Sequence, residues 1–262
     1  MPDSSLVLTD LKEGVLLITL DHPKANAFTD EMISALQATF KQAGRDAQVR
    51  SVLLSGSGKF FSTGRDLHDV SRAAGESFRF HLLRTFNPLV VQIRSLEKPV
   101  LAAVNGAAAG AGLGIALACD LRIASHDASF VVGFLGIGLA PDSAVSLLLP
   151  ALIGLGRATE AAFTNSPISA QQAFEWGLVN RLVAPADLAA QAFAWAVALA
   201  QGPVHAMGLA KRDFNQAILP DLERVLDYEA HLQEVAGRGD EFKEGVRAFL
   251  EKRPPGFVSF PV

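Results

Sequence analysis

The stretch from Pro99 to Asp120 constrains the fold of this chain more than any other. It carries no charge before Asp120 itself and contains four glycines. Its first half, Val100–Val104, is a short apolar run that ends at Asn105-Gly106, a pair that readily adopts positive φ and turns the chain. This pattern predicts a buried strand, a turn and then a helix that is packed closely at its N-terminal end. Such a helix start aims unpaired backbone N–H groups at an incoming oxygen atom.

Two other interpretations of this stretch have to be weighed. Its length and lack of charge meet the first test for a membrane-spanning segment, but alanine and glycine insert weakly and Asn105-Gly106 interrupts it. Close helix packing through small residues would explain the same composition. The spacing alone therefore leaves tight packing and an oxyanion site as open alternatives.

A second stretch repeats the same plan. Val52–Leu54 predicts another short buried strand, and a glycine-rich segment leads from it to Gly64 and a helix start at Asp66-Leu67. Two such units would each supply one backbone N–H to a single oxygen atom, the second of them from Arg65. Asp66 has an ordinary alternative role as a helix N-cap, and the Arg65 side chain has one as a solvated surface group.

Composition narrows the classes of function. The chain has 262 residues, enough for one large domain, and its formal net charge of -4 gives no basic field for nucleic acid or anionic membranes. It is 50% apolar and 19% charged, so we expect surface to be buried between subunits. Cys119 is the only cysteine, which excludes an intrachain disulfide and favours a reducing, cytoplasmic compartment. We find no export signal and no metal-ligand spacing, and we expect no metal.

The order of the predicted elements indicates an α/β fold. Leu6–Leu8 and Val15–Leu20 predict a hairpin, and the strands that follow alternate with helices, which is typical of a mainly parallel sheet. Residues 1–200 carry this alternation, whereas residues 201–262 are more charged and almost wholly helical in pattern. We expect a core followed by an appended helical region. Asp69–Phe86 has no strong period and is interpreted as a mobile helix or lid over a pocket.

Four motifs resemble those of the crotonase family, the enoyl-CoA hydratase/isomerase superfamily, and they occur in the family's order. They are Phe61–Leu67, Lys98–Gly114, Cys119-Asp120, and Ala173–Gly177 with the preceding Ser169. The similarity extends over nearly the entire chain. It implies a crotonase-like spiral of ββα repeats with a C-terminal helical trimerisation region, assembled as homotrimers or hexamers. It also implies an acyl-CoA thioester as substrate, with coenzyme A as part of that substrate and no separate cofactor.

The resemblance assigns an oxyanion hole to this sequence. In the family, the thioester carbonyl oxygen lies between two backbone N–H groups, which correspond here to those of Arg65 and Ala111. Glycine is usual at the second position, but alanine still offers its N–H, and only a required positive φ would disfavour it. Two such donors stabilise the enolate that forms when an α-proton is removed.

The acid or base that faces the substrate carbons decides the reaction. Hydratases of the family bear two glutamates, at positions that correspond to Gly114 and Phe134 here, and neither residue can transfer a proton. The resemblance therefore predicts isomerisation rather than addition of water. Gly138–Pro141 before Asp142 is similar to the isomerase branch associated with phenylacetate degradation, whose aspartate moves a proton in an unsaturated or ring-epoxide acyl-CoA. Without the resemblance, Asp142 would be interpreted as a helix N-cap.

The remaining predicted site residues bind substrate or coenzyme A. They are Lys24, Ala25, Gly64, Asp66, Leu67, Gly110, Phe134, Phe249 and Lys252, of which Phe249 and Lys252 reach a neighbouring subunit's coenzyme A in the family. Both lysines are equally compatible with solvated side chains. Two other functions stay open. Aryl-CoA dehalogenation is disfavoured because no tryptophan stands near Phe134 or Asp142, and a non-catalytic acyl-CoA-binding or RNA-associated scaffold would also lack both glutamates.

Overall fold

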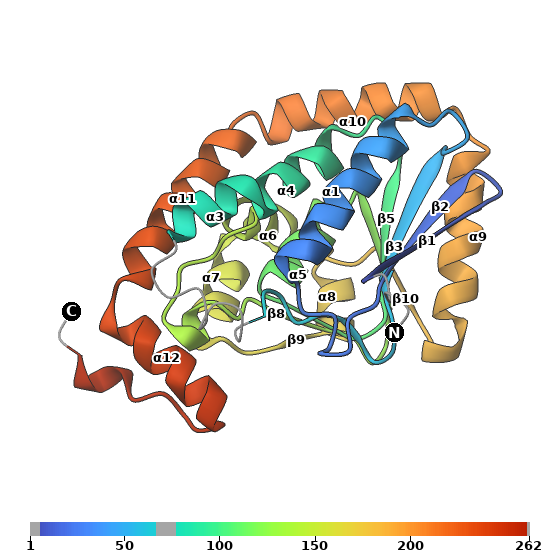
Figure 1. Ribbon diagram of the computed structural model, residues 1–262. Coiled ribbons are helices and arrows are strands. Elements are labelled where there is room, and N and C mark those ends of the chain that lie inside the picture. Colours follow the sequence, from blue (N-terminus) through green and yellow to red (C-terminus); the bar gives the residue numbers. More distant parts are fainter. Residues whose placement is uncertain (1–5, 67–76, 261–262) are drawn as a thin grey trace, which may run out of the picture.

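The computed structural model describes residues 6–66 and 77–260, which form two sheets surrounded by helices (Figure 1). The larger sheet has the order β1-β2-β3-β5-β7-β10, with β1 (Val7–Lys12), β2 (Val15–Leu20), β3 (Ser51–Gly56), β5 (Val100–Val104), β7 (Leu121–Ser125) and β10 (Arg181–Val183). The smaller sheet has the order β4-β6-β8-β9, with β4 (Phe60–Ser62), β6 (Ala107–Ala109), β8 (Ser129–Val131) and β9 (Ile168–Ser169).

The larger sheet is parallel except at its first edge. There β1 and β2 form the predicted antiparallel hairpin around Glu13 and Gly14, which have φ of 51° and 77°. Positive φ at both residues is what a two-residue turn needs to match the twist of the strands. The other strands are parallel and apolar, and β5 is buried along its whole length. The prediction of an α/β fold with a mainly parallel sheet is confirmed.

The two sheets are linked by a repeated path of the chain. Three times, a strand of the larger sheet leads directly to a short strand of the smaller one: from β3 to β4, from β5 to β6 and from β7 to β8. These are the ββ parts of the spiral that the family resemblance implies. The sequence predicted only a turn where β6 lies. Three alanines carry no alternation of apolar and polar residues, so nothing local marked them as a strand.

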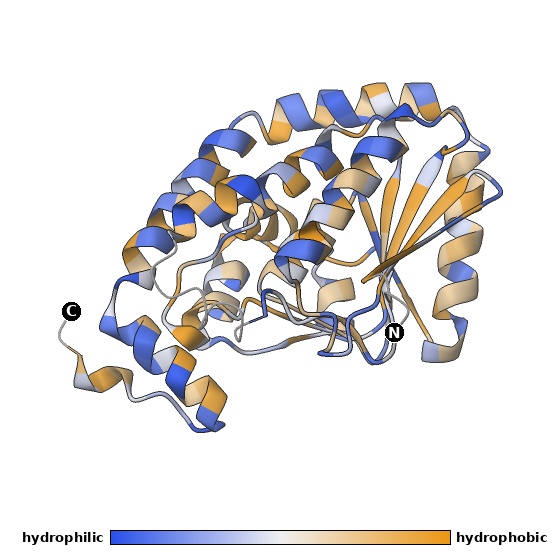
Figure 2. Ribbon diagram, in the orientation of Figure 1, coloured by the Kyte–Doolittle hydropathy of each residue, from blue (hydrophilic) through white to orange (hydrophobic). Residues whose placement is uncertain are grey.

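Helices cover both faces of the larger sheet and continue beyond it. They are α1 (Asp30–Arg45), α3 (Phe78–Arg84), α4 (Phe86–Ser95), α5 (Ala111–Ala118), α6 (Val145–Ile153), α7 (Leu155–Thr164), α8 (Ala170–Glu175), α9 (Leu188–Ala200), α10 (Val204–Ile218), α11 (Leu222–Gly237) and α12 (Asp240–Glu251), with 3₁₀ helices η1 (Leu135–Ile137), η2 (Pro185–Asp187) and η3 (Phe257–Ser259). Helix α9 packs on one face of the sheet, and α1, α4 and α5 belong to the main core on the other. The strands between them are strongly apolar (Figure 2).

Helix α5 is the central helix of the core, and every one of its residues is buried. The buried guanidinium of Arg122 caps its C-terminal end, donating to the carbonyl of Cys119 at 2.7 Å and to those of Ala116 and Leu117. A cation at this end satisfies carbonyls that have no partner within the helix and complements the helix dipole. The other end of α5, at Ala111, faces the glycine-rich turns.

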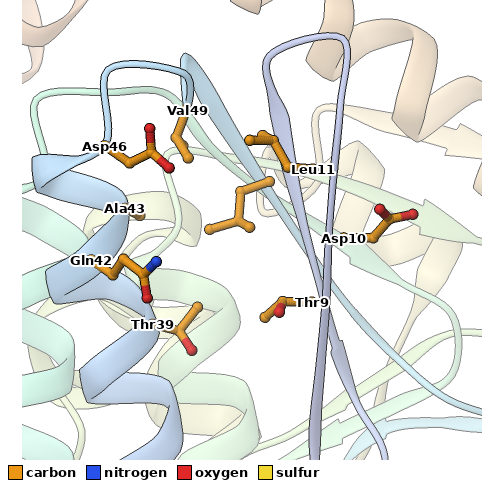
Figure 3. Close-up of a pocket in the computed structure, with 9 residues that line it drawn as sticks. Thr9, Asp10, Leu11, Thr39, Gln42, Ala43, Asp46 and Val49 are labelled. Atoms are coloured by element: carbon orange, nitrogen blue, oxygen red, sulfur yellow. The ribbon is translucent and has the colours of Figure 1, made fainter.

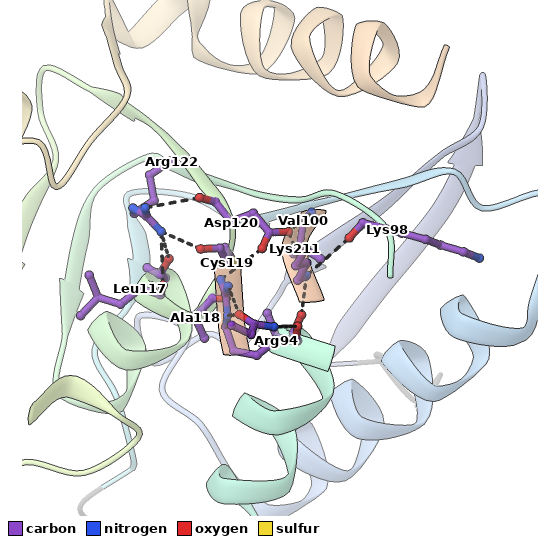
Figure 4. A network of polar contacts seen from close by, with 12 residues as sticks. Arg94, Lys98, Val100, Leu117, Ala118, Cys119, Asp120, Arg122 and Lys211 are labelled. Carbon is purple, nitrogen blue, oxygen red and sulfur yellow. Dashed lines mark hydrogen bonds and ion pairs between the residues drawn. The ribbon is translucent and has the colours of Figure 1, made fainter. Parts of the chain in front are cut away.

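A buried ionic cluster fixes the strand that precedes α5. The carboxylate of Asp120 accepts from Lys211 of α10 at 2.9 Å, from Arg94 of α4 at 3.1 Å and from the backbone N–H of Val100 at 2.9 Å (Figure 4). It therefore ties the start of β5 to two helices, one of them in the C-terminal region.

The C-terminal region consists of α10, α11 and α12, which pack against α4, α3 and η1 respectively. The predicted helical pattern beyond residue 200 is thus present, while the division of the chain into units 1–200 and 201–262 stays a prediction. Among residues 6–66 and 77–260, no helix has both the length and the apolar character needed to cross a membrane.

Candidate active site

Two glycine turns touch each other at the N-terminal end of α5. Gly64 follows β4 with φ of 83°, and a Cβ atom on it would lie 2.9 Å from the carbonyl oxygen of Ala109 and 3.2 Å from the nitrogen of Ala111. Glycine is required here both by the left-handed backbone and by this close approach. The structure therefore brings the segments of Arg65 and Ala111 together, as the sequence predicted.

The second turn leaves Ala111 in a helical conformation. The positive φ falls on Gly110, at 54°, and Ala111 is the first residue of α5. The first backbone bond within the helix runs from the N–H of Gly114 to the carbonyl of Gly110, at 3.1 Å. The N–H of Ala111 thus precedes the helical hydrogen-bond ladder and lies at the positive end of the helix dipole. The alanine at this position needs no unfavourable φ.

The loop that includes Lys24 and Ala25 lies beside the first turn. The N–H of Thr63 donates to the carbonyl of Ala25 at 3.3 Å, and the Lys24 ammonium forms an ion pair with the buried carboxylate of Asp66 at 3.0 Å. Ala25 has φ of 55°, an uncommon conformation for a residue with a side chain. The structure brings these residues to Gly64, and their role in binding coenzyme A stays a prediction. Leu67 and residues 69–76 of the predicted lid lie outside the described residues, whereas the rest of that segment contains α3 and the first residue of α4.

Asp142 is a buried carboxyl whose hydrogen-bond partners are neutral. Its Oδ1 accepts from the Ser143 hydroxyl at 2.7 Å and its Oδ2 from the Gln233 carboxamide at 2.8 Å. Burial raises the pKa of Asp142 to about 6, against the opposing effects of the Ser143 hydrogen bond, the positive charge of Arg65 and the Gln233 hydrogen bond. The Arg65 side chain thus acts electrostatically on this carboxyl.

The alternative role of Asp142 as a helix N-cap is wrong for its side chain. Helix α6 begins at Val145 after a left-handed Ala144, and no local side chain caps it. The carboxylate that accepts hydrogen bonds from the N–H groups at its start belongs to a residue far along the chain. Glu229 of α11 accepts from the N–H of Ala144 at 2.8 Å, from the N–H of Ser146 at 3.0 Å, and from the Ser146 hydroxyl.

The turn between Asp142 and α6 is strained. Ser143 and Ala144 are consecutive left-handed residues, with φ of 56° and 62°, and such non-glycine residues cost on the order of 1 kcal/mol or more each. Both are fully buried. The bonds to Glu229 offset part of this strain, so the position of Asp142 depends on α11.

This turn also fills the space beside Gly114 of α5. A Cβ atom on Gly114 would lie 2.5 Å from the Cβ of Ser143 and 2.7 Å from its carbonyl oxygen. Gly114 stands one helical turn after Ala111. The contact consequently places the segment of Asp142 next to the helix end that the two glycine turns share.

The other predicted residues divide into one near the site and two away from it. Phe134 is buried, and its ring lies 3.9 Å from where a Cβ on Gly110 would stand, so it lines the turn as an apolar group. Phe249 is 58% exposed and Lys252 is also exposed, at the far end of α12. Their role at a neighbouring subunit's site stays a prediction.

Sequence reasoning missed Ser143, Glu229 and Gln233. A signal for the two residues of α11 was present, because its buried positions Leu222, Leu226, Glu229, Ala230 and Gln233 follow helical spacing. A carboxylate and a carboxamide on the core face of an amphipathic helix require polar partners. The sequence alone does not say which partners these are.

A groove on the surface lies outside this site. It runs between the β1–β2 hairpin and the C-terminal half of α1 and is lined by Thr9, Asp10, Leu11, Leu16, Thr39, Gln42, Ala43, Asp46 and Val49 (Figure 3). Arg65 acts electrostatically on Asp30, at the opposite end of α1, so groove and site are separated by most of that helix. Within the described residues, no three His, Cys, Asp or Glu side chains are grouped to hold a metal ion.

Comparison with known proteins agrees with this geometry. Residues 10–259 match the family model described as enoyl-CoA hydratase/isomerase. The chain is 40% identical to the 1,2-epoxyphenylacetyl-CoA isomerase of Escherichia coli K12, over 96% of this chain and 98% of that protein. It is 34% identical to 4-chlorobenzoyl coenzyme A dehalogenase-1 of Arthrobacter sp., over 83% and 80%. 

Among solved structures, an enoyl-CoA hydratase from Mycobacterium avium subsp. paratuberculosis K-10 superimposes with a TM-score of 0.88 at 33% identity, covering 96% of this chain and 98% of that one. These similarities confirm the spiral fold and the resemblance to the 1,2-epoxyphenylacetyl-CoA isomerase that the motifs indicated. The chain therefore belongs to the enoyl-CoA hydratase/isomerase family, the crotonase superfamily.

Proposed function

We propose that this protein is an acyl-CoA isomerase that isomerises a double bond or a ring epoxide by moving a proton through a thioester enolate. The family and the 40% identical isomerase support an acyl-CoA substrate. Asp142 is the group that takes and returns the proton. The reaction needs no cofactor, since coenzyme A is carried by the substrate.

The enolate oxygen is held by backbone groups. The N–H of Ala111, at the start of α5, and the N–H of Arg65, beside Gly64, are the two donors in this proposal. A Cβ atom on Gly64 would lie only 3.2 Å from the nitrogen of Ala111, so both donors belong to one small region. Preorganised donors of this kind lower the barrier by about 3–4 kcal/mol each.

The observation that carries the proposal is the environment of Asp142. Its hydrogen-bond donors are neutral, and burial raises its pKa to about 6. A general base with a pKa close to the working pH is ionised enough to accept a proton and acidic enough to return it. A carboxyl group fixed between cations would do neither step readily.

The direct test is Asp142→Asn with 3-enoyl-CoA as substrate. Loss of the general base should lower kcat by ~10²-fold or more, while the exposed Asp127→Asn serves as a matched control that keeps its activity. Retention of more than about a tenth of the wild-type rate by Asp142→Asn would exclude the carboxyl as the base. Entry of solvent deuterium at the α carbon reports enolate formation separately and should disappear in the same variant.

Dehalogenation of an aryl-CoA is the second candidate, favoured by the identity with the Arthrobacter dehalogenase. In that chemistry, an aspartate attacks the ring and a tryptophan aims the attacked group. The two tryptophans here stack elsewhere, Trp176 with Arg157 and Trp195 with Arg181. Chloride release from 4-chlorobenzoyl-CoA, measured beside the isomerase assay, separates the two functions, and coenzyme A binding without either turnover would favour a scaffold.

A further inference from the structure

One face of α11 is aimed at the segment that carries Asp142. Glu229 and Gln233 lie one helical turn apart, and both are almost fully buried, at 2% and 1% exposure. Glu229 accepts from the N–H groups of Ala144 and Ser146, directly after the strained turn. Gln233 donates to the Oδ2 of Asp142 at 2.8 Å and to the carbonyl of Ala140 at 2.6 Å, directly before that turn.

Within the turn itself, one backbone hydrogen bond gives local support, from the N–H of Val145 to the carbonyl of Asp142 at 3.0 Å. Helix α6 lacks a local side-chain cap, and Ser143 and Ala144 are both left-handed. A capping carboxylate normally comes from the residue at the helix start. Here it comes from a different helix, so the conformation of residues 142–144 is coupled to the placement of α11.

From these contacts we propose that Glu229 and Gln233 are positioning residues for Asp142. Glu229 fixes the backbone of the turn, and Gln233 fixes the rotamer of the carboxyl. This inference rests on the proposed isomerase function, because it assigns these residues a role through Asp142. Neither residue is proposed to touch the substrate.

The carboxamide of Gln233 suits a carboxyl that changes its protonation state. When Asp142 is ionised, the Gln233 amide donates to it. When Asp142 has taken up a proton, it becomes a donor and needs an acceptor. The Oε1 of Gln233 is buried and has no hydrogen-bond partner in the described part of the chain, so it is one acceptor available beside the carboxyl, and the Ser143 hydroxyl is another. Turning Oε1 toward Asp142 would release the bond from Gln233 to the Ala140 carbonyl.

Among the described residues, the charged group that acts on this carboxyl is Arg65, from the loop after β4, and the carboxyl in turn acts on Glu229, from α11. Arg65 favours the ionised form of Asp142, and the charge of Asp142 contributes to the raised pKa of Glu229. The hydrogen bond from Gln233 also favours the ionised form. Removing that hydrogen bond should therefore raise the pKa of Asp142.

The experiment uses the full-length enzyme and the 3-enoyl-CoA assay. Glu229→Gln keeps the size of the side chain but replaces one accepting oxygen with an NH2 group, which cannot accept from the backbone N–H that faces it. We expect kcat to fall about tenfold with little change in KM, as for the loss of one hydrogen bond to a charged group. Gln233→Met should lower kcat by a similar factor and move the acid limb of the kcat/KM profile to higher pH. Glu223→Gln, the same charge change on an exposed part of α11, is the control.

Double variants distinguish positioning from simple support of the fold. Combined with Asp142→Asn, neither Gln233→Met nor Glu229→Gln should reduce the residual rate further, because residues that act through one group are not additive. Full activity of both single variants, or additive losses in both doubles, would overturn the inference. Should Glu229→Gln fail to fold, the Gln233→Met arm decides alone. If Asp142→Asn itself retains activity, the proposed function fails, and that result is separate from these.

Discussion

Asp120 and Asp142 are both largely buried aspartates near α5, and they differ in what surrounds them. The carboxylate of Asp120 is ion-paired with Lys211 at 2.9 Å and Arg94 at 3.1 Å (Figure 4). Asp142 receives its hydrogen bonds from a hydroxyl and a carboxamide. The ion pairs of Asp120 tie it into the framework of the fold, whereas Asp142 forms no ion pair of this kind with any residue that the structure describes, and burial raises its pKa to about 6. The two carboxyls therefore differ in their partners and also in their burial, since the Asp120 side chain is 18% exposed and Asp142 is 8% exposed.

The largest expected effect tests the structural half of this comparison. Asp120→Asn leaves Lys211, which is only 8% exposed, without its carboxylate. Breaking a buried ion pair in this way should lower the free energy of unfolding by about 3–5 kcal/mol, measured by urea denaturation. The activity of the folded fraction should remain.

The exposed pair Arg212–Glu97 provides the matched control. Glu97→Gln should change the stability by less than about 1 kcal/mol. An equally small effect of Asp120→Asn would show that the two aspartates do not differ in structural importance.

The second prediction is a substitution that raises, rather than lowers, the free energy of unfolding. Because the pKa of Asp142 is raised to about 6 in the folded protein, its contribution to stability is fully present below pH ~4 and is lost as the pH rises through about 6. Above that pH, the buried charge destabilises the fold. Asp142→Asn should thus increase the free energy of unfolding by about 1–3 kcal/mol at pH 8, and the hydroxyl of Ser143 can accept from the new amide.

The same measurement at several pH values sharpens this point. The difference between Asp142→Asn and the wild type should shrink toward zero as the pH is lowered to about 4. A variant that is less stable than the wild type at pH 8 would mean that the carboxylate at 142 stabilises the structure, as that of Asp120 does.

The smallest effect is the pH dependence of the reaction. If Asp142 must be ionised to accept a proton, kcat/KM should fall about tenfold per pH unit below its pKa of about 6. Initial rates between pH 4.5 and 8 would locate this limb. If the rate instead falls only near pH 4, the pKa of Asp142 is not raised and its environment does not distinguish it from an exposed carboxyl.

Local patterns predicted what local forces determine. The hairpin around Glu13 and Gly14, strand β5 and the helix that starts at Ala111 follow from turn chemistry and apolar runs. The strands β4 and β6 were not predicted, because neither Phe60–Ser62 nor Ala107–Ala109 has an alternating pattern of apolar and polar residues, and each gains its pairing from strands elsewhere in the chain.

The candidate site divides in the same way. The backbone turns at Gly64 and Gly110 are marked by their glycines, so their meeting could be predicted from motif and family. The partners of Asp142 could not be, since Gln233 lies 91 residues further on. Burial of Glu229 and Gln233 on the core face of α11 was visible as a pattern, but the contact it serves depends on how the C-terminal helices fold back.

The crowding between Gly114 and Ser143 limits how this enzyme could acquire another chemistry. If position 114 is where hydratases carry a glutamate, as the family resemblance implies, any side chain there meets the backbone of the neighbouring turn at 2.7 Å. Replacing Gly114 alone with glutamate would create a steric clash with the turn and would not place a usable carboxyl in the site. Conversion toward a hydratase would have to begin by rebuilding residues 142–144, and an evolving lineage would have to abandon one proton-transferring group before it could install the other.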